Sequence, residues 1–257
     1  MKMKDEELKY YEKRKDWNFD MFEIKSERLT NWDMFKILNE LATKESKILD
    51  LGTGGGEKVI KYFPECNEIL GTDFSPEMIN TANFNLKESG RKNITFKVMN
   101  NLNMNVPDNY YDVVVARHTI IDPNQIYKCL KRKGYLIIRG VDKYDCWDLK
   151  TIFNKGQGFN DEMSISILDY KNVLNAGFKD AELSFIYEID YFKNKHLFEE
   201  FLKKVPILDD FSEAEKDNKD YYKSCIDNEL LDRYIKENTY DGKIKLLRRY
   251  YGITARK

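Results

Sequence analysis

Short apolar runs alternate with amphipathic segments through the middle of the chain. The runs have the length of buried strands, and the segments between them repeat apolar residues every three or four positions, as one face of a helix does. We therefore expect strands at 47–51, 68–72, 93–98, 111–116 and 134–139, with helices at 57–63, 76–88 and 123–131. Strands that alternate with helices of this length form βαβ units and a parallel sheet.

The flanks of this alternating region follow a looser pattern. Before it, Trp32, Phe35 and Leu38 share one face of a helix that we expect over 32–42. After it, we expect an irregular loop, a helix that ends at Gly177, a strand, two amphipathic helices and a last strand. Their ranges are 141–164, 166–176, 182–190, 195–204, 226–237 and 243–255.

No internal repeat or low-complexity linker divides the chain, so we expect one domain over residues 1–257. Within it the pattern separates four parts. These are an N-terminal helical arm (1–44), a core (45–190), a helical insertion (191–242) and a last strand (243–257).

Composition is typical of a globular protein, with 42% hydrophobic and 34% charged residues and a formal net charge of −1. Balanced charge argues against a dedicated nucleic-acid binder, but it does not exclude RNA as a substrate. No apolar run approaches the ~18 residues of a membrane span, so we expect no membrane partner.

Cysteine and histidine spacing gives no sign of a metal site. The chain has only two histidines, and its four cysteines (Cys66, Cys129, Cys146 and Cys225) are far apart, whereas structural zinc needs clustered ligands. The N-terminus lacks the apolar core of a secretory signal. We therefore expect reduced thiols and a cytoplasmic location.

The segment ILDLGTGGGE (48–57) joins a strand to a helix through a glycine turn. Such turns at the carboxyl ends of parallel strands are where open α/β sheets bind ligands. A phosphate-binding loop requires Gly-Lys-Ser/Thr, and the dinucleotide fingerprint requires glycine where Glu57 stands. Because Glu57 would also repel a pyrophosphate, we expect a ligand without phosphates.

An ordered set of motifs over 47–140 resembles the class I S-adenosylmethionine-dependent methyltransferases. Gly52-x-Gly54-x-Gly56 resembles their motif I, and Asp73 lies 21 positions after Gly52, close to the ~20-residue offset of a ribose-binding carboxylate. The later matches are the adenine-contacting loop at 100–102, the fourth strand at 111–117 and the segment leading to the fifth strand at 130–138. Two positions depart from the pattern, Asn100 in place of Asp and Lys133 in place of Pro.

The resemblance implies a Rossmann-like, seven-stranded, mostly parallel sheet with helices on both faces and a helical insertion before the last strand. It also implies S-adenosylmethionine as cofactor. The expected cofactor-binding residues are Asp50, Gly52, Thr53, Gly54, Gly56, Asp73, Phe74, Ser75, Met78, Asn100, Asn101, Leu102 and Arg117. Of these, Asp73 would contact the ribose hydroxyls, Phe74 or Met78 would flank the adenine, and Asp50 would hold the glycine loop or the donor's ammonium group.

Arg117 and His118 end the fourth expected strand at the edge where the methyl donor would lie, so both are candidate catalytic residues. A lone histidine is more often structural, but this position leaves a general-base role open. The aromatic residues Tyr10, Tyr11 and Trp17 could form a lid over the donor or anchor the arm. Strand alternation predicts that residues 248–251 form a half-exposed face.

Asp122-Pro123-Asn124-Gln125 resembles only part of the Asp-Pro-Pro-aromatic motif of methyltransferases that act on amino groups of nucleic acids. The same residues form a good helix start, with Asp122 as N-cap, Pro123 in the first turn and Gln125 at N3. We therefore expect a helix cap here.

Methyl transfer from S-adenosylmethionine releases a neutral thioether, so positioning of the acceptor matters more than acid catalysis. We expect a methyltransferase that acts on a small molecule. One alternative is a methyltransferase for RNA or a protein side chain that uses lysines and arginines of the insertion. Another is a non-catalytic S-adenosylmethionine-binding subunit. An NAD-dependent oxidoreductase is disfavoured by Glu57. The oligomeric state is not indicated by the sequence.

Overall fold

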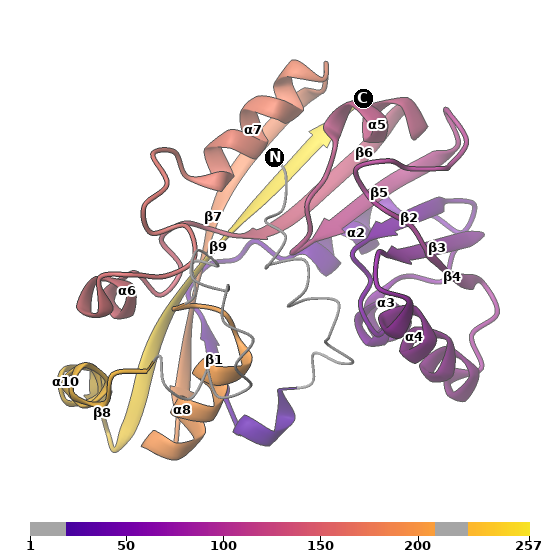
Figure 1. The fold of residues 1–257 in the computed structure, drawn as a ribbon. Coiled ribbons are helices and arrows are strands. Elements are labelled where there is room, and N and C mark those ends of the chain that lie inside the picture. Colours follow the sequence, from indigo (N-terminus) through magenta and orange to yellow (C-terminus); the bar gives the residue numbers. More distant parts are fainter. Residues whose placement is uncertain (1–18, 209–225) are drawn as a thin grey trace.

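The computed structural model describes residues 19–208 and 226–257. One mixed sheet runs through it in the order β1-β7-β9-β6-β5-β2-β3-β4, with β8 paired to β9 (Figure 1). The strands are β1 (Lys25–Arg28), β2 (Lys47–Leu51), β3 (Glu68–Asp73), β4 (Ile94–Val98), β5 (Tyr111–Arg117), β6 (Leu130–Val141), β7 (Lys179–Phe192), β8 (Thr239–Tyr240) and β9 (Lys243–Arg256). All seven expected strands are present, which confirms the Rossmann-like fold class, and β1 and β8 are additional.

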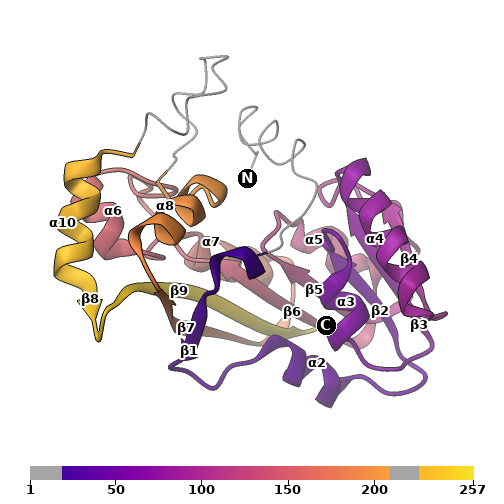
Figure 2. The same ribbon diagram turned by 90° about the horizontal axis from the view of Figure 1, so that it is seen from below.

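Helices cover both faces of the sheet (Figure 2). In β5, Val113 and Val115 share a core cluster with residues of α2, α3 and α4, whereas Val114 and Ala116 share one with α5 and α7. This alternation is the period of two that strand geometry imposes. The helices are η1 (Asp20–Phe22), α2 (Met34–Leu41), α3 (Glu57–Tyr62), α4 (Pro76–Ser89), α5 (Pro123–Cys129), α6 (Trp147–Phe153), α7 (Ile165–Asn175), α8 (Lys195–Lys204) and α10 (Asn228–Asn238).

Strands β2 to β6 pair in parallel, and with α3, α4 and α5 they form what we term the donor half. Two of its helices begin at side-chain caps. The hydroxyl of Ser75 accepts from the amide of Met78 at 3.3 Å, and the carboxylate of Asp122 accepts from the amide of Asn124 at 2.9 Å. The expected cap at Asp122 is therefore confirmed.

Strands β7 and β9 continue beyond the donor half as a long antiparallel pair (Figure 1). β6 pairs only with residues 250–256 of β9, whereas β7 pairs along β9 as far as Phe192 opposite Ile244. Strand β1 pairs with residues 188–191 of β7, and helices α6, α8 and α10 pack around the same extension. We term this region the extended half.

A core of aromatic and aliphatic side chains fills the extended half. The ring centroid of Phe192 lies 5.0 Å from that of Phe198 and 5.0 Å from that of Phe201. Phe198 also stacks on Tyr234, with 5.7 Å between the centroids. All four side chains are buried. The insertion therefore folds onto the ends of the strands that it connects.

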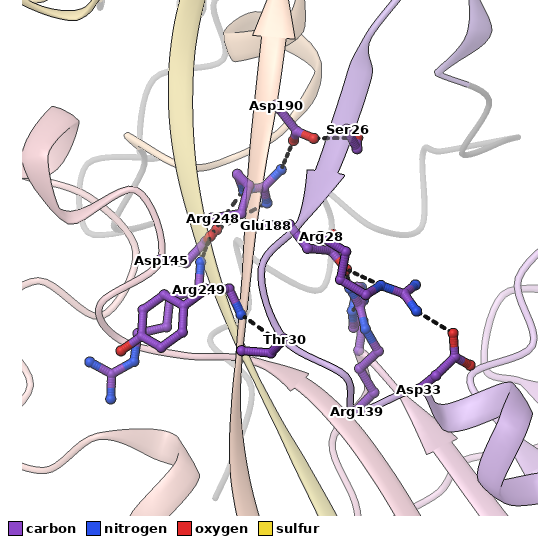
Figure 3. A network of polar contacts seen from close by, with 12 residues as sticks. Ser26, Arg28, Thr30, Asp33, Arg139, Asp145, Glu188, Asp190, Arg248 and Arg249 are labelled. Atoms are coloured by element: carbon purple, nitrogen blue, oxygen red, sulfur yellow. Dashed lines mark hydrogen bonds and ion pairs between the residues drawn. The ribbon is translucent and has the colours of Figure 1, made fainter.

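Arg248, Tyr250 and Tyr251 are buried and only Arg249 is half-buried, so the expectation that residues 248–251 form a half-exposed face is wrong. The guanidinium of Arg248 donates to both carboxylate oxygens of Asp145 at 3.0 Å and to Asp190 at 3.2 Å (Figure 3). Asp190 also accepts from the hydroxyl of Ser26 at 2.5 Å. Strand alternation predicted that Arg248 would face solvent. The structure surrounds it with protein instead and places Asp145 and Asp190 against its charge.

Two elements differ from their expected structure. The arm that we expected to be helical contains β1, and the loop expected over 141–164 contains α6. All four residues of β1 are exposed. The residue before α6, Cys146, has a φ of 53° and makes no side-chain cap. Neither element carries the local pattern by which strands and helices are predicted.

Candidate functional site

The glycine turn lies between β2 and α3. Gly52, Gly54 and Gly56 have φ values of 77°, 57° and 76°, which is the left-handed region that favours glycine. The amides of Gly52 and Thr53 both donate to the carbonyl of Thr72 in β3, at 2.8 and 2.9 Å. The turn is therefore tied to the neighbouring strand through its backbone.

Space around the turn also requires glycine. A Cβ on Gly52 would lie 2.7 Å from the Cβ of Thr119, and a Cβ on Gly56 would lie 2.7 Å from the ring of Phe96. Side chains at both positions would collide with packed neighbours. Glycine is therefore required at both positions by space as well as by φ.

Asp73 ends β3 and holds the turn directly. One carboxylate oxygen accepts from the amide of Gly54 at 3.0 Å, and the other accepts from the amide of Ser75 at 3.0 Å. Burial raises the pKa of Asp73, while hydrogen bonds from backbone amides oppose that rise. The residue expected to bind ribose therefore also positions the glycine turn.

Asp50 lies beneath the same turn and is 3% exposed. Burial raises the pKa of its carboxyl to about 7, the charge of Arg117 lowers it, and the charge of Asp73 adds to the rise. The amide of Gly54 donates to Asp73 rather than to Asp50. The side-chain hydroxyl of Thr53 in the turn also lowers this pKa. Both roles expected for Asp50, holding the glycine loop and binding an ammonium group, stay predictions.

The start of α4 completes this side of the site. Ser75 and Met78 are buried at 1% and 2% exposure, whereas Phe74 is half-buried. Met78 is therefore part of the packed interior, and Phe74 is the residue of the pair that has a surface available to a ligand.

The loop after β4 contains the residues expected to contact adenine. The side-chain oxygen of Asn100 already accepts from the amide of Leu102 at 2.9 Å, and both residues are exposed. Asn101 is 8% exposed, and its amide donates to the hydroxyl of Thr119 at 2.9 Å. Its carbonyl oxygen is buried without a hydrogen-bond partner among the described residues. A buried acceptor without a partner destabilises the protein, and a hydrogen bond donated by a ligand would remove that cost.

Gln125 fixes the position of that loop. Its side-chain amide donates to the carbonyl of Leu102 at 2.7 Å, and its oxygen accepts from the amide of Met104 at 2.7 Å. We expected Gln125 only as part of a helix cap, and its contact with the carboxylate of Asp122 at 2.9 Å fits that role. Nothing in the sequence pattern predicted that Gln125 would also bind the loop at Leu102 and Met104.

Arg117 and His118 meet two residues that sequence reasoning missed. Nη1 of Arg139 lies 2.5 Å from Nε2 of His118, and the ring of Tyr250 stacks on the His118 ring at 5.7 Å between centroids. His118 is exposed, yet desolvation by surrounding protein and the charges of Arg139, Arg117 and Arg248 lower its pKa well below the usual value. The imidazole is therefore neutral.

A cavity of about 200 Å³ opens beside Arg117. It lies on the α2 face of the sheet because Arg117 and Arg139 continue the alternation of Val115 and Ile137, which pack against α2 and α3. Its lining comes from α2 and the segment before it, from α3, and from the four strands β1, β5, β6 and β7. The lining residues are Arg28, Trp32, Asp33, Met34, Phe35, Lys58, Arg117, Arg139 and Glu188.

Three further expectations concern the aromatic residues of the N-terminal arm, metal binding and membrane spans. Tyr10, Tyr11 and Trp17 lie outside the described residues. In the described ranges no cluster of three or more His, Cys, Asp or Glu side chains could hold a metal ion. None of the helices in those ranges is long and apolar enough to cross a membrane.

The chain is similar to known methyltransferases in sequence. A family model described as a methyltransferase domain matches residues 42–239. The uncharacterized methyltransferase YcgJ of Bacillus subtilis is 27% identical over 107 residues, which are 39% of this chain and 42% of YcgJ. That alignment therefore spans less than half of the relative.

Solved structures share the fold at low identity. The structure of YcgJ has a TM-score of 0.58 at 14% identity and covers 87% of this chain and 97% of its own. A candidate methyltransferase from Bacillus halodurans has a TM-score of 0.58 at 18% identity and covers 88% and 98%. The [4+2]-cyclase SpnF has a TM-score of 0.54 at 16% identity and covers 87% and 80%. Likeness at this level shows the fold alone.

The family match spans most of the chain and includes the glycine turn, Asp73 and Arg117. The buried orphan oxygen of Asn101 fits a ligand that carries a hydrogen-bond donor. The chain therefore belongs to the methyltransferase-domain family.

Proposed function

We propose that this methyltransferase transfers a methyl group to a small molecule. The observation that carries the proposal is the cavity of about 200 Å³ beside Arg117, walled by α2, α3 and the sheet. A volume of this size matches part of a small metabolite, whereas an RNA or protein acceptor needs an open groove.

We assign donor binding to the turn and the strand ends around it. S-adenosylmethionine supplies an activated methyl group on its sulfonium when bound. Asp73 would accept from the ribose hydroxyls, the orphan oxygen of Asn101 from the adenine amine, and Asp50 from the ammonium group. The remaining contacts would come from Gly52, Thr53, Gly54, Gly56, Phe74, Ser75, Leu102 and Arg117.

Arg117 and His118 would orient the acceptor. Nε2 of a neutral His118 accepts from Arg139, so the lone pair that a general base would use is already engaged. Three nearby arginines also disfavour the protonated imidazole. The same geometry leaves the Nδ1 proton available as a donor to an oxygen of the acceptor.

Two observations weigh against the alternative functions. In the described part of the insertion, two lysines that an RNA could use are paired with acids, Lys195 with Asp232 at 2.6 Å and Lys203 with Glu199 at 2.8 Å. A non-catalytic subunit would have its acceptor side closed by packed side chains, whereas the cavity beside Arg117 is open.

The test is a methyl-transfer assay that measures release of S-adenosylhomocysteine. The protein is incubated with S-adenosylmethionine and, in parallel, with a small-metabolite fraction, total RNA or total protein. We expect product only with the small-metabolite fraction, and none with a Gly54→Val variant used as control. Product with RNA or protein alone would overturn the proposal.

A further inference from the structure

The cavity beside Arg117 contains more positive than negative side chains. Arg28, Lys58, Arg117 and Arg139 line it together with only two acids, Asp33 and Glu188. None of the residues assigned to the donor lines it except Arg117. The cavity is therefore next to the donor site but separate from it.

The two acids are already used by two of the cations. Arg28 pairs with Asp33 and lies 3.7 Å from Glu188, and Arg139 lies 3.4 Å from the same Glu188 oxygen. Within the described residues, Arg117 and Lys58 have no ion pair. Two of the four cations in the lining thus lack an anion.

Arg117 lies close to another cation, although the charge of Asp50 acts on it as well. It stands directly opposite Arg139 in the β5–β6 register. Burial lowers the pKa of its guanidinium, the charge of Arg139 lowers it further, and the charges of Asp50 and Glu57 oppose this. Like charges held together away from water repel strongly unless an anion lies between them.

The cavity borders the reacting centre. The carbonyl oxygen of Arg117 would lie 3.2 Å from a Cβ on Gly52, so the strand end touches the glycine turn. Lys58 is in the first turn of α3, directly after that loop. An acceptor held in the cavity would thus extend towards the donor.

We propose that Arg117, Arg139 and Lys58 form a subsite for a carboxylate or phosphate group of the acceptor. The substrate is then an anionic small molecule. The guanidinium of Arg117 can bind either anion through paired N–H donors. Arg139 already contacts His118 through Nη1 and Glu188 through Nη2, so it adds positive charge, as Lys58 does. This inference rests on the proposed function and names the substrate class for it.

The first test titrates the protein, saturated with S-adenosylhomocysteine, with inorganic phosphate and with acetate by calorimetry. We expect one of the two anions to bind, and both Arg139→Gln and Lys58→Gln to weaken it at least about tenfold. Lys61→Gln is the matched control, because Lys61 is an exposed lysine on the same helix, and it should change nothing. Absence of binding would overturn the subsite.

The donor also has a carboxylate, so a second measurement identifies the source of the anion. Affinities for S-adenosylhomocysteine and for methylthioadenosine, which lacks the amino-acid part, are compared in both variants. We expect both affinities to be unchanged. If only the affinity for S-adenosylhomocysteine falls, the subsite serves the donor and the inference is wrong.

A third measurement separates this inference from the proposed function. Small acids that serve as acceptors are compared with their neutral amides in the methyl-transfer assay. Turnover of acids only supports the anionic substrate. Turnover of neutral molecules would overturn the subsite and leave the proposed function standing, whereas turnover of RNA or protein alone would overturn the proposed function.

Discussion

In the donor half, backbone groups and one carboxylate fix the positions that matter, whereas in the extended half buried ion pairs and aromatic rings do so. The glycine turn is held by the carbonyl of Thr72 and the carboxylate of Asp73. The extension is held by Arg248 between Asp145 and Asp190, and by packed phenylalanines. The difference indicates that the geometry of the glycine turn and the stability of the extension depend on separate sets of contacts.

The largest expected effect is on donor binding. Val at position 54 must adopt the left-handed φ of 57°, which costs roughly 1–2 kcal/mol, and its side chain would fill the ligand side of the turn. Gly54→Val should therefore abolish binding of S-adenosylhomocysteine in calorimetry.

Gly90→Val is the matched control, because Gly90 has a φ of 69° with nothing within 4 Å of its Cβ position. It should lose similar stability and retain binding. Equal retention of binding by both variants would show that the turn merely reverses the chain.

The next effect is on stability in the extended half. Arg248→Met leaves Asp145 and Asp190 buried without their cation, and loss of one partner of a buried pair costs about 3–5 kcal/mol. Urea unfolding should show this loss, while affinity for S-adenosylhomocysteine stays unchanged.

Arg233→Met serves as control, since Arg233 pairs with Glu237 on the exposed face of α10, where such a pair contributes about 0.5 kcal/mol or less. If Arg248→Met weakens donor binding as much as it weakens the fold, the two halves are not separable.

A smaller effect is expected at Asp73. Asn at this position keeps one acceptor but places an amide against a backbone N–H, and it removes the charge that would face the ribose. We expect binding of S-adenosylhomocysteine to weaken roughly ten- to a hundredfold, from loss of ~1.5–3 kcal/mol. Asp122→Asn is the control, because Asn caps helices as well as Asp does. Equal affinity in both variants would remove Asp73 from the site.

The smallest effect depends on pH. The pKa of Asp50 is about 7 in the folded protein and 3.8 as a free group, so its stabilising contribution is complete below pH 3.8 and is lost as pH rises through about 7. Asp50→Asn should therefore gain about 2 kcal/mol relative to wild type between about pH 5 and about pH 8 in urea unfolding. A constant difference across this range would mean that Asp50 is charged throughout.

The donor half could be predicted from sequence because its signals are local. The glycine turn, the cap at Ser75 and the strand end at Asp73 are each specified by residues that adjoin the element they control. It was harder to predict which asparagine of the loop after β4 keeps a free acceptor oxygen. The orphan acceptor is on Asn101, whereas the family pattern points to Asn100, because a local bond to Leu102 occupies the latter.

The extended half was predicted less well because its signals are distant in sequence. Strand β1 is specified only by its pairing with β7. Helix α6 is held by Lys150, which is buried and donates to the carbonyls of Lys143 and Gln157 at 3.1 and 2.8 Å. Arg139 reaches the candidate site through the pairing of β6 with β5, and Tyr250 reaches it only when β9 pairs with β6.

The place of β9 between β6 and β7 also has a consequence for biosynthesis. Until the ribosome has made residues 243–256, β6 and β7 cannot be joined, and each exposes an unpaired edge. Such edges are templates for aggregation, and contacts this distant in sequence form slowly. A nascent chain of this protein therefore needs protection, by a chaperone or by the ribosome itself, until its last described strand closes the sheet.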